Sequence, residues 1–203
     1  MKKDSIIYPI VFMTILAAVF TLILAILNES TIAMVEENQN LDLQRKILYI
    51  FNMYDESTSD ETVIKTFNDQ IKVTENSNQE KIYSLVENDD VKAIAIPFSG
   101  PGLWGSIKGY IGLTSDLSQI TGIEFIEQNE TPGLGGRIGE SPYKEQYRGV
   151  EIDPSSQMNV INRPANGGNI DAVSGATQTS DFVQNMVNNG LNKYFEEFGQ
   201  GGK

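Results

Sequence analysis

The sequence predicts an α+β protein, in which an N-terminal transmembrane helix precedes a domain made of an antiparallel sheet with flanking helices. Three observations predict this fold class. A long uncharged apolar segment lies at the N-terminus, short segments with alternating apolar residues occupy the middle, and an apolar stripe with helical spacing lies near the C-terminus. The 203 residues, 40% of them hydrophobic, suit one or two compact domains.

The N-terminal apolar segment runs from Ser5 to Leu27, which is 23 residues without a charged side chain. As a helix it would be roughly 35 Å long, enough to cross the apolar core of a bilayer, which is about 30 Å thick. A cleaved signal peptide is the alternative, but its apolar part is usually only about 7 to 15 residues long. We therefore predict a membrane anchor over residues 1–28.

The charges beside this segment predict its orientation. Lys2 and Lys3 precede it, whereas Asn28 and Glu29 follow it. Positively charged flanks favour the cytoplasmic side. The sequence therefore predicts a single-pass protein of the cytoplasmic (inner) membrane, with a cytoplasmic N-terminus and an extracytoplasmic C-terminal domain.

Residues 29–80 are predicted to form a membrane-proximal helical leader. Within it, Glu36 to Tyr54 carries apolar residues near the i, i+3, i+4 spacing of a one-faced helix. Asp55 to Asp60 is a polar, acidic loop. The pattern from Glu61 to Asn76 leaves helix and strand both open.

Residues 81–203 are predicted to form the main domain. Apolar alternation and turn residues predict four strands, which pair antiparallel in order: Lys81 to Val86, Val91 to Phe98, Ser106 to Leu113 and Gln119 to Glu127. A short strand is expected at Met158 to Ile161, within a polar, loop-rich stretch, and a turn at Gly167-Gly168. Asp181 to Phe198 carries a helical apolar stripe, which predicts a core-packed helix that ends at Gly199.

Composition excludes several kinds of chemistry. The chain contains no Cys and no His, which excludes disulfides, thiolate metal sites, Fe–S clusters and His-activated nucleophiles. We predict no metal site, and any redox chemistry must come from a bound organic cofactor. The net charge of −12 argues against nucleic acid as a partner, because binding phosphates needs a basic surface.

The heptad from Asp171 to Thr177 (DAVSGAT) is the first candidate site. Small residues at 174 to 176 let backbone approach a ligand, and Gly175 can adopt a positive φ. Thr177 would lie exposed near a helix start, where free N–H groups and the helix dipole favour a phosphate. An ordinary helix cap uses the same residue types, so both interpretations stay open from these residues alone.

Two glycine-rich loops are further candidates. Gly102-Leu103-Trp104 holds the only Trp, for which core packing and ligand contact are both open. Glu130 to Gly136 (ETPGLGG) follows a predicted strand and combines three glycines with a proline, which indicates a special backbone path. Neither loop contains G-x-G-x-x-G or a P-loop lysine, so dinucleotide and ATP binding are not supported.

The order D-x-x-S-G-A-T resembles the flavinylation motif of the FMN-binding subunits of the Nqr and Rnf membrane complexes. The segments L-D-x-Q-R-K-I-L (Leu41 to Leu48), G-L-W and E-T-P-G-L-G occur in the order of that family. The leader and G-L-W are more similar to the FMN-binding subunit of Nqr, NqrC, than to its counterpart in Rnf, RnfG.

This resemblance implies a flavin site. FMN would be bound covalently to Thr177 through a phosphoester made by a separate flavin transferase, with Asp171, Ser174, Gly175 and Ala176 completing the motif. It also implies that Glu130, Thr131, Leu134 and Gly135 lie beside the isoalloxazine ring. The similar G-L-W segment of the family places Gly102, Leu103 and Trp104 in the same cofactor site.

The resemblance further implies a membrane-anchored electron carrier that passes single electrons within a respiratory complex. An Nqr complex moves electrons from NADH to ubiquinone while translocating Na⁺, and this carrier would need the other membrane subunits for turnover. An Rnf carrier would instead relay electrons between ferredoxin and NAD. A cofactor-free anchored extracellular binding module and a free-standing flavoprotein reductase are the alternatives from other classes.

Overall fold

The computed structural model describes residues 7–198. The chain forms two compact units, 1–42 and 43–203. Helix α1 is one element of 44 residues, Ile7–Ile50, and it is long and apolar enough to cross a membrane. The predicted span and the predicted helix from Glu36 are therefore a single helix, since no Gly or Pro lies between them. Lys2 and Lys3, on which the predicted orientation depends, lie outside the described residues.

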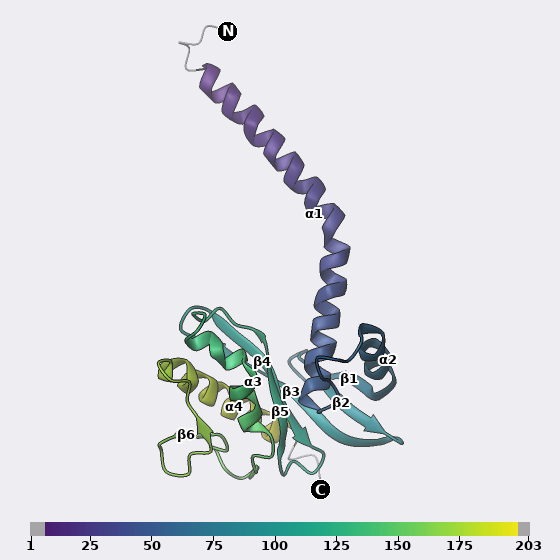
Figure 1. Cartoon of the computed structure of the whole chain (residues 1–203), viewed down its shortest axis with the longest axis vertical. Coiled ribbons are helices and arrows are strands. Elements are labelled where there is room, and N and C mark those ends of the chain that lie inside the picture. Colours follow the sequence, from purple (N-terminus) through teal and green to yellow (C-terminus); the bar gives the residue numbers. More distant parts are fainter. Residues whose placement is uncertain (1–6, 199–203) are drawn as a thin grey trace. The chain divides into compact units, whose positions relative to one another are not determined.

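The second unit is built on a five-stranded antiparallel sheet with the order β1-β2-β3-β4-β5 (Figure 1). Its strands are β1 Ile71–Glu75, β2 Lys81–Glu87, β3 Asp90–Pro101, β4 Ser106–Thr114 and β5 Ile120–Glu127. The four predicted strands are confirmed. The segment that the pattern left open holds both structures, because helix α2 (Asp60–Gln70) leads directly into β1. The sheet thus begins ten residues before the expected start at residue 81.

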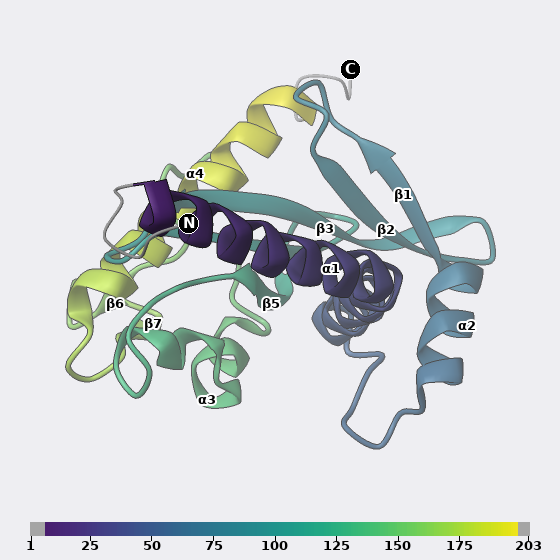
Figure 2. The same ribbon diagram turned by 90° about the horizontal axis from the view of Figure 1, so that it is seen from above.

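Helix α4 (Thr177–Phe198) packs against β3 on one face of the sheet, and α2 lies on the other side (Figure 2). The core under α4 joins its apolar stripe to inward residues of the central strands, such as Ile96, Ile111 and Phe125. The predicted C-terminal helix is confirmed, but it begins at Thr177, four residues before Asp181. The predicted stop at Gly199 lies outside the described residues.

The loop-rich segment between β5 and α4 contains short helices and one small strand pair. Its elements are η1 Gly135–Gly139, α3 Ser141–Lys144, η2 Glu145–Tyr147, β6 Asn162–Arg163 and β7 Ile170–Asp171. The strand expected at Met158 to Ile161 was wrong. Asn188 of α4 explains this, because its amide group bonds the N–H groups of Asn159 and Val160 and the Val160 carbonyl at 2.7–3.0 Å. A helix side chain therefore satisfies the backbone that a neighbouring strand would otherwise pair.

The last residues of α1 pack on the sheet face opposite α4, where two glycines without side chains let the helix end approach the strands closely. Ile111 and Leu113 of β4 point into the core under α4, so Gly112 between them faces the other side. Gly112 pairs with Gly122 of β5, and a Cβ at Gly112 would lie 2.3 Å from the Cγ2 atom of Ile50. The fully buried Ile50 thus lies over paired glycines.

Gly122→Ala is expected to lower the free energy of unfolding by about 1–3 kcal/mol, a usual cost of overpacking. The added Cβ would lie 2.8 Å from the Ile50 carbonyl oxygen and 3.1 Å from the Ile50 Cα atom, and backbone atoms cannot simply rotate away. Chemical denaturation measures the loss. Gly139→Ala is the matched control, because its Cβ meets nothing within 4 Å. Equal losses in the two variants would contradict this packing.

Candidate functional site

The carboxylate of Glu130 joins all three segments that the sequence singled out. Its Oε1 atom accepts hydrogen bonds from the backbone N–H groups of Leu103 (2.7 Å) and Trp104 (3.1 Å). Its Oε2 atom accepts a bond of 2.6 Å from the hydroxyl of Thr179, in the first turn of α4. Glu130 is only 5% exposed. The loop at 102–105, the loop at 130–136 and the start of α4 therefore converge on one buried side chain.

Two of the predicted site glycines leave room for this carboxylate. A Cβ at Gly102 would lie 2.6 Å from Glu130 Oε1, and a Cβ at Gly135 would lie 2.8 Å from Glu130 Oε2. The Gly135 Cβ would also lie 2.7 Å from the Thr179 hydroxyl oxygen. These distances are shorter than real Cβ contacts, so any larger residue would displace the carboxylate.

The loop after Glu130 is a compact turn with an apolar tip. The carbonyl of Thr131 accepts hydrogen bonds from the N–H groups of Leu134 (3.1 Å) and Gly136 (3.0 Å), and Gly133 supplies a positive φ of 74°. Thr131 and Leu134 are exposed. A Cβ at Gly175 would lie 3.3 Å from a methyl carbon of Leu134, so this tip touches the S-G-A-T turn.

The S-G-A-T turn presents Thr177 to solvent. Gly175 has a φ of 79°, and the N–H of Ala176 donates to the Val173 carbonyl at 2.9 Å. The buried hydroxyl of Ser180 accepts from the Val173 N–H at 2.9 Å and fastens the turn to α4. Ser174 and Thr177 are exposed, and Thr177 is the first residue of the helix. The hydroxyl therefore lies beside the N–H groups that a helix start leaves unpaired.

Leu103 and Trp104 lie on the surface, not in the core. They are 49% and 68% exposed, and Leu134 is 46% exposed. Core packing of Trp104, the simpler interpretation of the sequence, is therefore wrong. All three apolar side chains come from the loops that Glu130 joins.

Asp171 faces a different surface of the motif. It forms an exposed ion pair of 3.1 Å with Arg163, and its N–H donates to the Gln146 side chain at 2.7 Å. A cleft of about 180 Å³ adjoins it, and its lining includes Arg137, Tyr143, Gln146, Asp171, Val173 and Ser174. Asp171 and Ser174 thus border a hollow on the side of η1 and α3, while Gly175 contacts Leu134.

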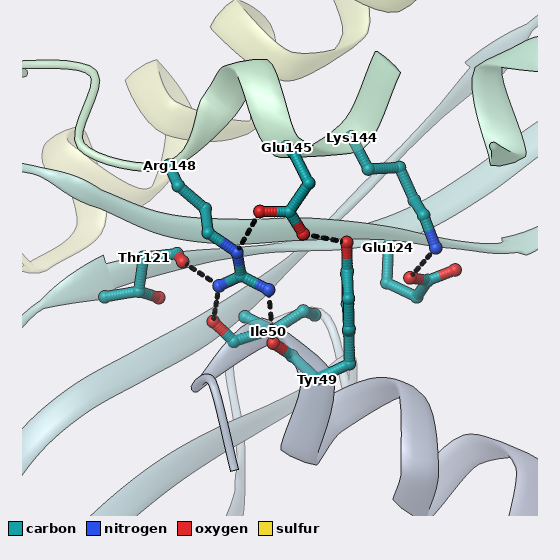
Figure 3. Close-up of polar contacts among 7 residues, drawn as sticks. All are labelled: Tyr49, Ile50, Thr121, Glu124, Lys144, Glu145 and Arg148. Atoms are coloured by element: carbon teal, nitrogen blue, oxygen red, sulfur yellow. Dashed lines mark hydrogen bonds and ion pairs between the residues drawn. The ribbon is translucent and has the colours of Figure 1, made fainter. Parts of the chain in front are cut away.

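A polar cluster that was not predicted from the sequence joins residues 144–148, which follow the loop at 130–136, to the end of α1 (Figure 3). The Arg148 guanidinium donates to the carbonyls of Tyr49 (2.7 Å), Ile50 (3.3 Å) and Thr121, and to the Glu145 carboxylate (2.9 Å). The Tyr49 hydroxyl donates to the same carboxylate. Arg148 therefore bonds the carbonyls at the C-terminal end of α1, which the helix itself leaves free.

Burial and the neighbouring charges shift the pKa values of this cluster. It raises the pKa of Tyr49 to about 12, and the hydrogen bond to Glu145 acts in the same direction. Burial also works to raise the pKa of Glu145, but the Tyr49 hydrogen bond and the Arg148 charge together lower it. Burial raises the pKa of Glu124, although Lys144 lies 2.5 Å away and opposes the shift. Lys144 Nζ also lies 4.4 Å from the Tyr49 ring centroid.

Sequence reasoning missed Thr179, Ser180 and Arg148. The two hydroxyls lie two and three positions after Thr177, at buried positions of α4 that precede the predicted helix start at Asp181, so their only signal was that they stand directly before that start. No comparable signal marked Arg148, because its partners are backbone carbonyls distant in sequence.

Part of this chain is similar to known proteins. Residues 102–192 match the family model of the FMN-binding domain. The NqrC polypeptide of the Na⁺-translocating NADH-quinone reductase of Vibrio anguillarum is 31% identical over 122 residues, which are 57% of this chain and 48% of the relative. Its counterpart from Neisseria meningitidis is 33% identical over 128 residues, 60% of this chain and 49% of the relative. The chain thus spans about half the length of the curated relatives it matches.

Solved structures show the same fold. The crystal structure of NqrC from Shewanella oneidensis aligns with a TM-score of 0.68 and 20% identity, over 81% of this chain and 98% of that one. The corresponding crystal structure from Parabacteroides distasonis aligns with a TM-score of 0.65 and 26% identity, over 80% and 94%. The predicted fold class and the predicted resemblance to NqrC are confirmed. The two glycine-rich loops and the S-G-A-T turn all lie within the matched FMN-binding domain.

Proposed function

We propose that this protein, a relative of NqrC from the Na⁺-translocating NADH-quinone reductases with an FMN-binding domain, is a membrane-anchored carrier of single electrons. One observation carries the proposal. Three separate segments meet at the buried Glu130, the third of them through Thr179, two residues after the exposed Thr177, and all of them lie within the matched residues 102–192. The site residues fit FMN because they combine an exposed hydroxyl, a helix start and apolar loop tips.

Thr177 would hold the phosphate of FMN through a phosphoester made by a flavin transferase. Its place at the start of a 22-residue helix favours an anionic group, through free N–H groups and the helix dipole. The positive φ of Gly175 bends the backbone just before it. Ser174, Ala176 and Asp171 complete the motif and would shape the turn for the transferase.

The exposed apolar side chains would cover the isoalloxazine ring. Leu103, Trp104 and Leu134 place large apolar surfaces in water, and a flat aromatic ligand would remove part of that surface from water. Thr131, Gly102 and Gly135 belong to the same two loops and would set how closely the backbone approaches the ring. When bound, FMN supplies the one-electron chemistry that the side chains of this chain lack.

Helix α1 supports the anchoring part of the proposal. Residues 1–28 would cross the bilayer once, with the N-terminus in the cytoplasm and the flavin domain outside. The leader at 29–80 would join this span to residues 81–203, and its strand β1 completes the sheet of the domain. The other membrane subunits of an Nqr complex would supply and accept the electrons between NADH and quinone and couple them to Na⁺. The named relatives favour this complex over Rnf.

The mass of the full chain purified from its native membranes tests the proposal. We expect an increment equal to FMN minus water, on a peptide that contains Thr177. The flavin should not turn over NADH in the purified chain, because a carrier needs its complex. A chain without the increment would support the cofactor-free binding module, and NADH turnover by the chain alone would support a free-standing reductase.

A further inference from the structure

We propose that Thr179, which lies outside the D-x-x-S-G-A-T motif, is a positioning residue of the flavin site and acts through Glu130. The inference rests on the proposed function and extends it. Thr179 is 2% exposed and its hydroxyl lies 2.6 Å from Glu130 Oε2, so it touches no exposed surface of the site itself. Its effect on a flavin must therefore pass through the groups that it holds.

The direction of the Thr179 hydrogen bond is the first argument. Ser and Thr hydroxyls inside helices commonly bond a carbonyl of the preceding turn. The neighbouring Ser180 does this, since its hydroxyl donates to the Ala176 carbonyl at 3.2 Å. Thr179 instead donates across to another segment of the chain, 49 residues away. This hydroxyl is used for a tertiary contact.

The rotation of the helix is the second argument. Successive residues of an α-helix are turned by about 100°, so Thr177 and Thr179 point about 200° apart. Fixing Thr179 inward on Glu130 therefore turns Thr177 outward, which agrees with a buried Thr179 and an exposed Thr177. Thr179 therefore orients the Thr177 hydroxyl, the group to which FMN would be attached.

The fit of the carboxylate is the third argument. Glu130 accepts from Leu103 N–H, Trp104 N–H and the Thr179 hydroxyl, and a carboxylate strengthens each of these hydrogen bonds. The backbone at Gly102 and Gly135 encloses it closely enough that a Cβ at either position would clash. Through these hydrogen bonds, the carboxylate connects the backbone of Leu103 and Trp104 to the first turn of α4, which bears Thr177.

Thr179→Val tests the inference, because it keeps the shape of the side chain and removes the donor. In the full chain coexpressed with a flavin transferase, we expect the rate of flavin attachment to fall about tenfold or more, the order expected when a reacting group is misplaced. The flavin that does attach should show a shifted absorption spectrum and midpoint potential. Thr179→Ser keeps the hydroxyl and should restore all three quantities. Thr74→Val, at an exposed position of β1, is the matched control.

The outcomes separate this inference from the proposed function. Wild type and Thr179→Val with the same attachment rate, spectrum and potential overturn the inference alone. A wild-type chain that takes no flavin overturns the proposed function and the inference with it. If Thr179→Val does not fold, Gly135→Ala provides the second test, because its Cβ would push against both Thr179 and Glu130. It should give the same changes, with Gly139→Ala as control, and a wild-type profile in Gly135→Ala overturns the inference.

Discussion

Thr177→Val is expected to abolish covalent flavin on this protein, whereas Thr177→Ser retains it. The phosphoester needs a hydroxyl oxygen, and Val has the shape of Thr without one. Because Thr177 is exposed and begins α4, its replacement should change the free energy of unfolding by only about 0.5 kcal/mol. Coexpression with a flavin transferase, followed by ultraviolet fluorescence of a denaturing gel, measures the attached flavin.

The Thr177 experiment has an internal comparison. Thr74→Val removes an exposed hydroxyl from β1 and should leave the fluorescent band unchanged. A band that survives in Thr177→Val would show that flavin is attached elsewhere. That outcome would show that the S-G-A-T turn is not the site of flavin attachment.

Arg148→Met is expected to lower the free energy of unfolding by about 2–4 kcal/mol, through the loss of a largely buried, multiply bonded charge. The substitution leaves the carbonyls of Tyr49, Ile50 and Thr121 without this donor, and Glu145 without its cation. Urea denaturation of the detergent-solubilised full chain, followed by circular dichroism, measures the change.

Arg137→Met is the matched control for Arg148→Met. Arg137 makes a single ion pair of 3.2 Å with Glu140, and its side chain is 43% exposed, whereas that of Arg148 is 20% exposed. Exposed pairs of this kind usually contribute less than about 1 kcal/mol. If the two variants lose the same stability, the bonds to the end of α1 do not stabilise the domain.

Local patterns predicted most of the secondary structure. Alternation in Val91 to Phe98 and the stripe of Asp181 to Phe198 each reflect one buried face, so period alone identified a strand and a helix. The same reasoning was wrong at Met158 to Ile161, because the amide of Asn188 bonds that backbone from α4. A short apolar run does not reveal whether its partner is a strand or a side chain.

For the candidate site too, the sequence identified local segments but not the contacts between them. The sequence indicated Gly102 to Trp104, Glu130 to Gly135 and Asp171 to Thr177 as separate segments, and the resemblance assigned them to one site. It placed Glu130 beside the flavin ring. In the structure both of its carboxylate oxygens are bonded within the protein, which favours a role in holding the loops.

The sequence by itself determined the apolar N-terminal helix, four of the five strands of the sheet, the C-terminal helix and the identity of the exposed hydroxyl, because each depends on residues close together in the chain. Only the tertiary structure decided that Glu130 joins the two loops to Thr179 and that Arg148 bonds the end of α1. The physical reason is that both contacts are hydrogen bonds between residues 49 and 99 positions apart. No local period or composition indicates such a pairing, because the first forms only when α4 packs on the sheet and the second only when the end of α1 does.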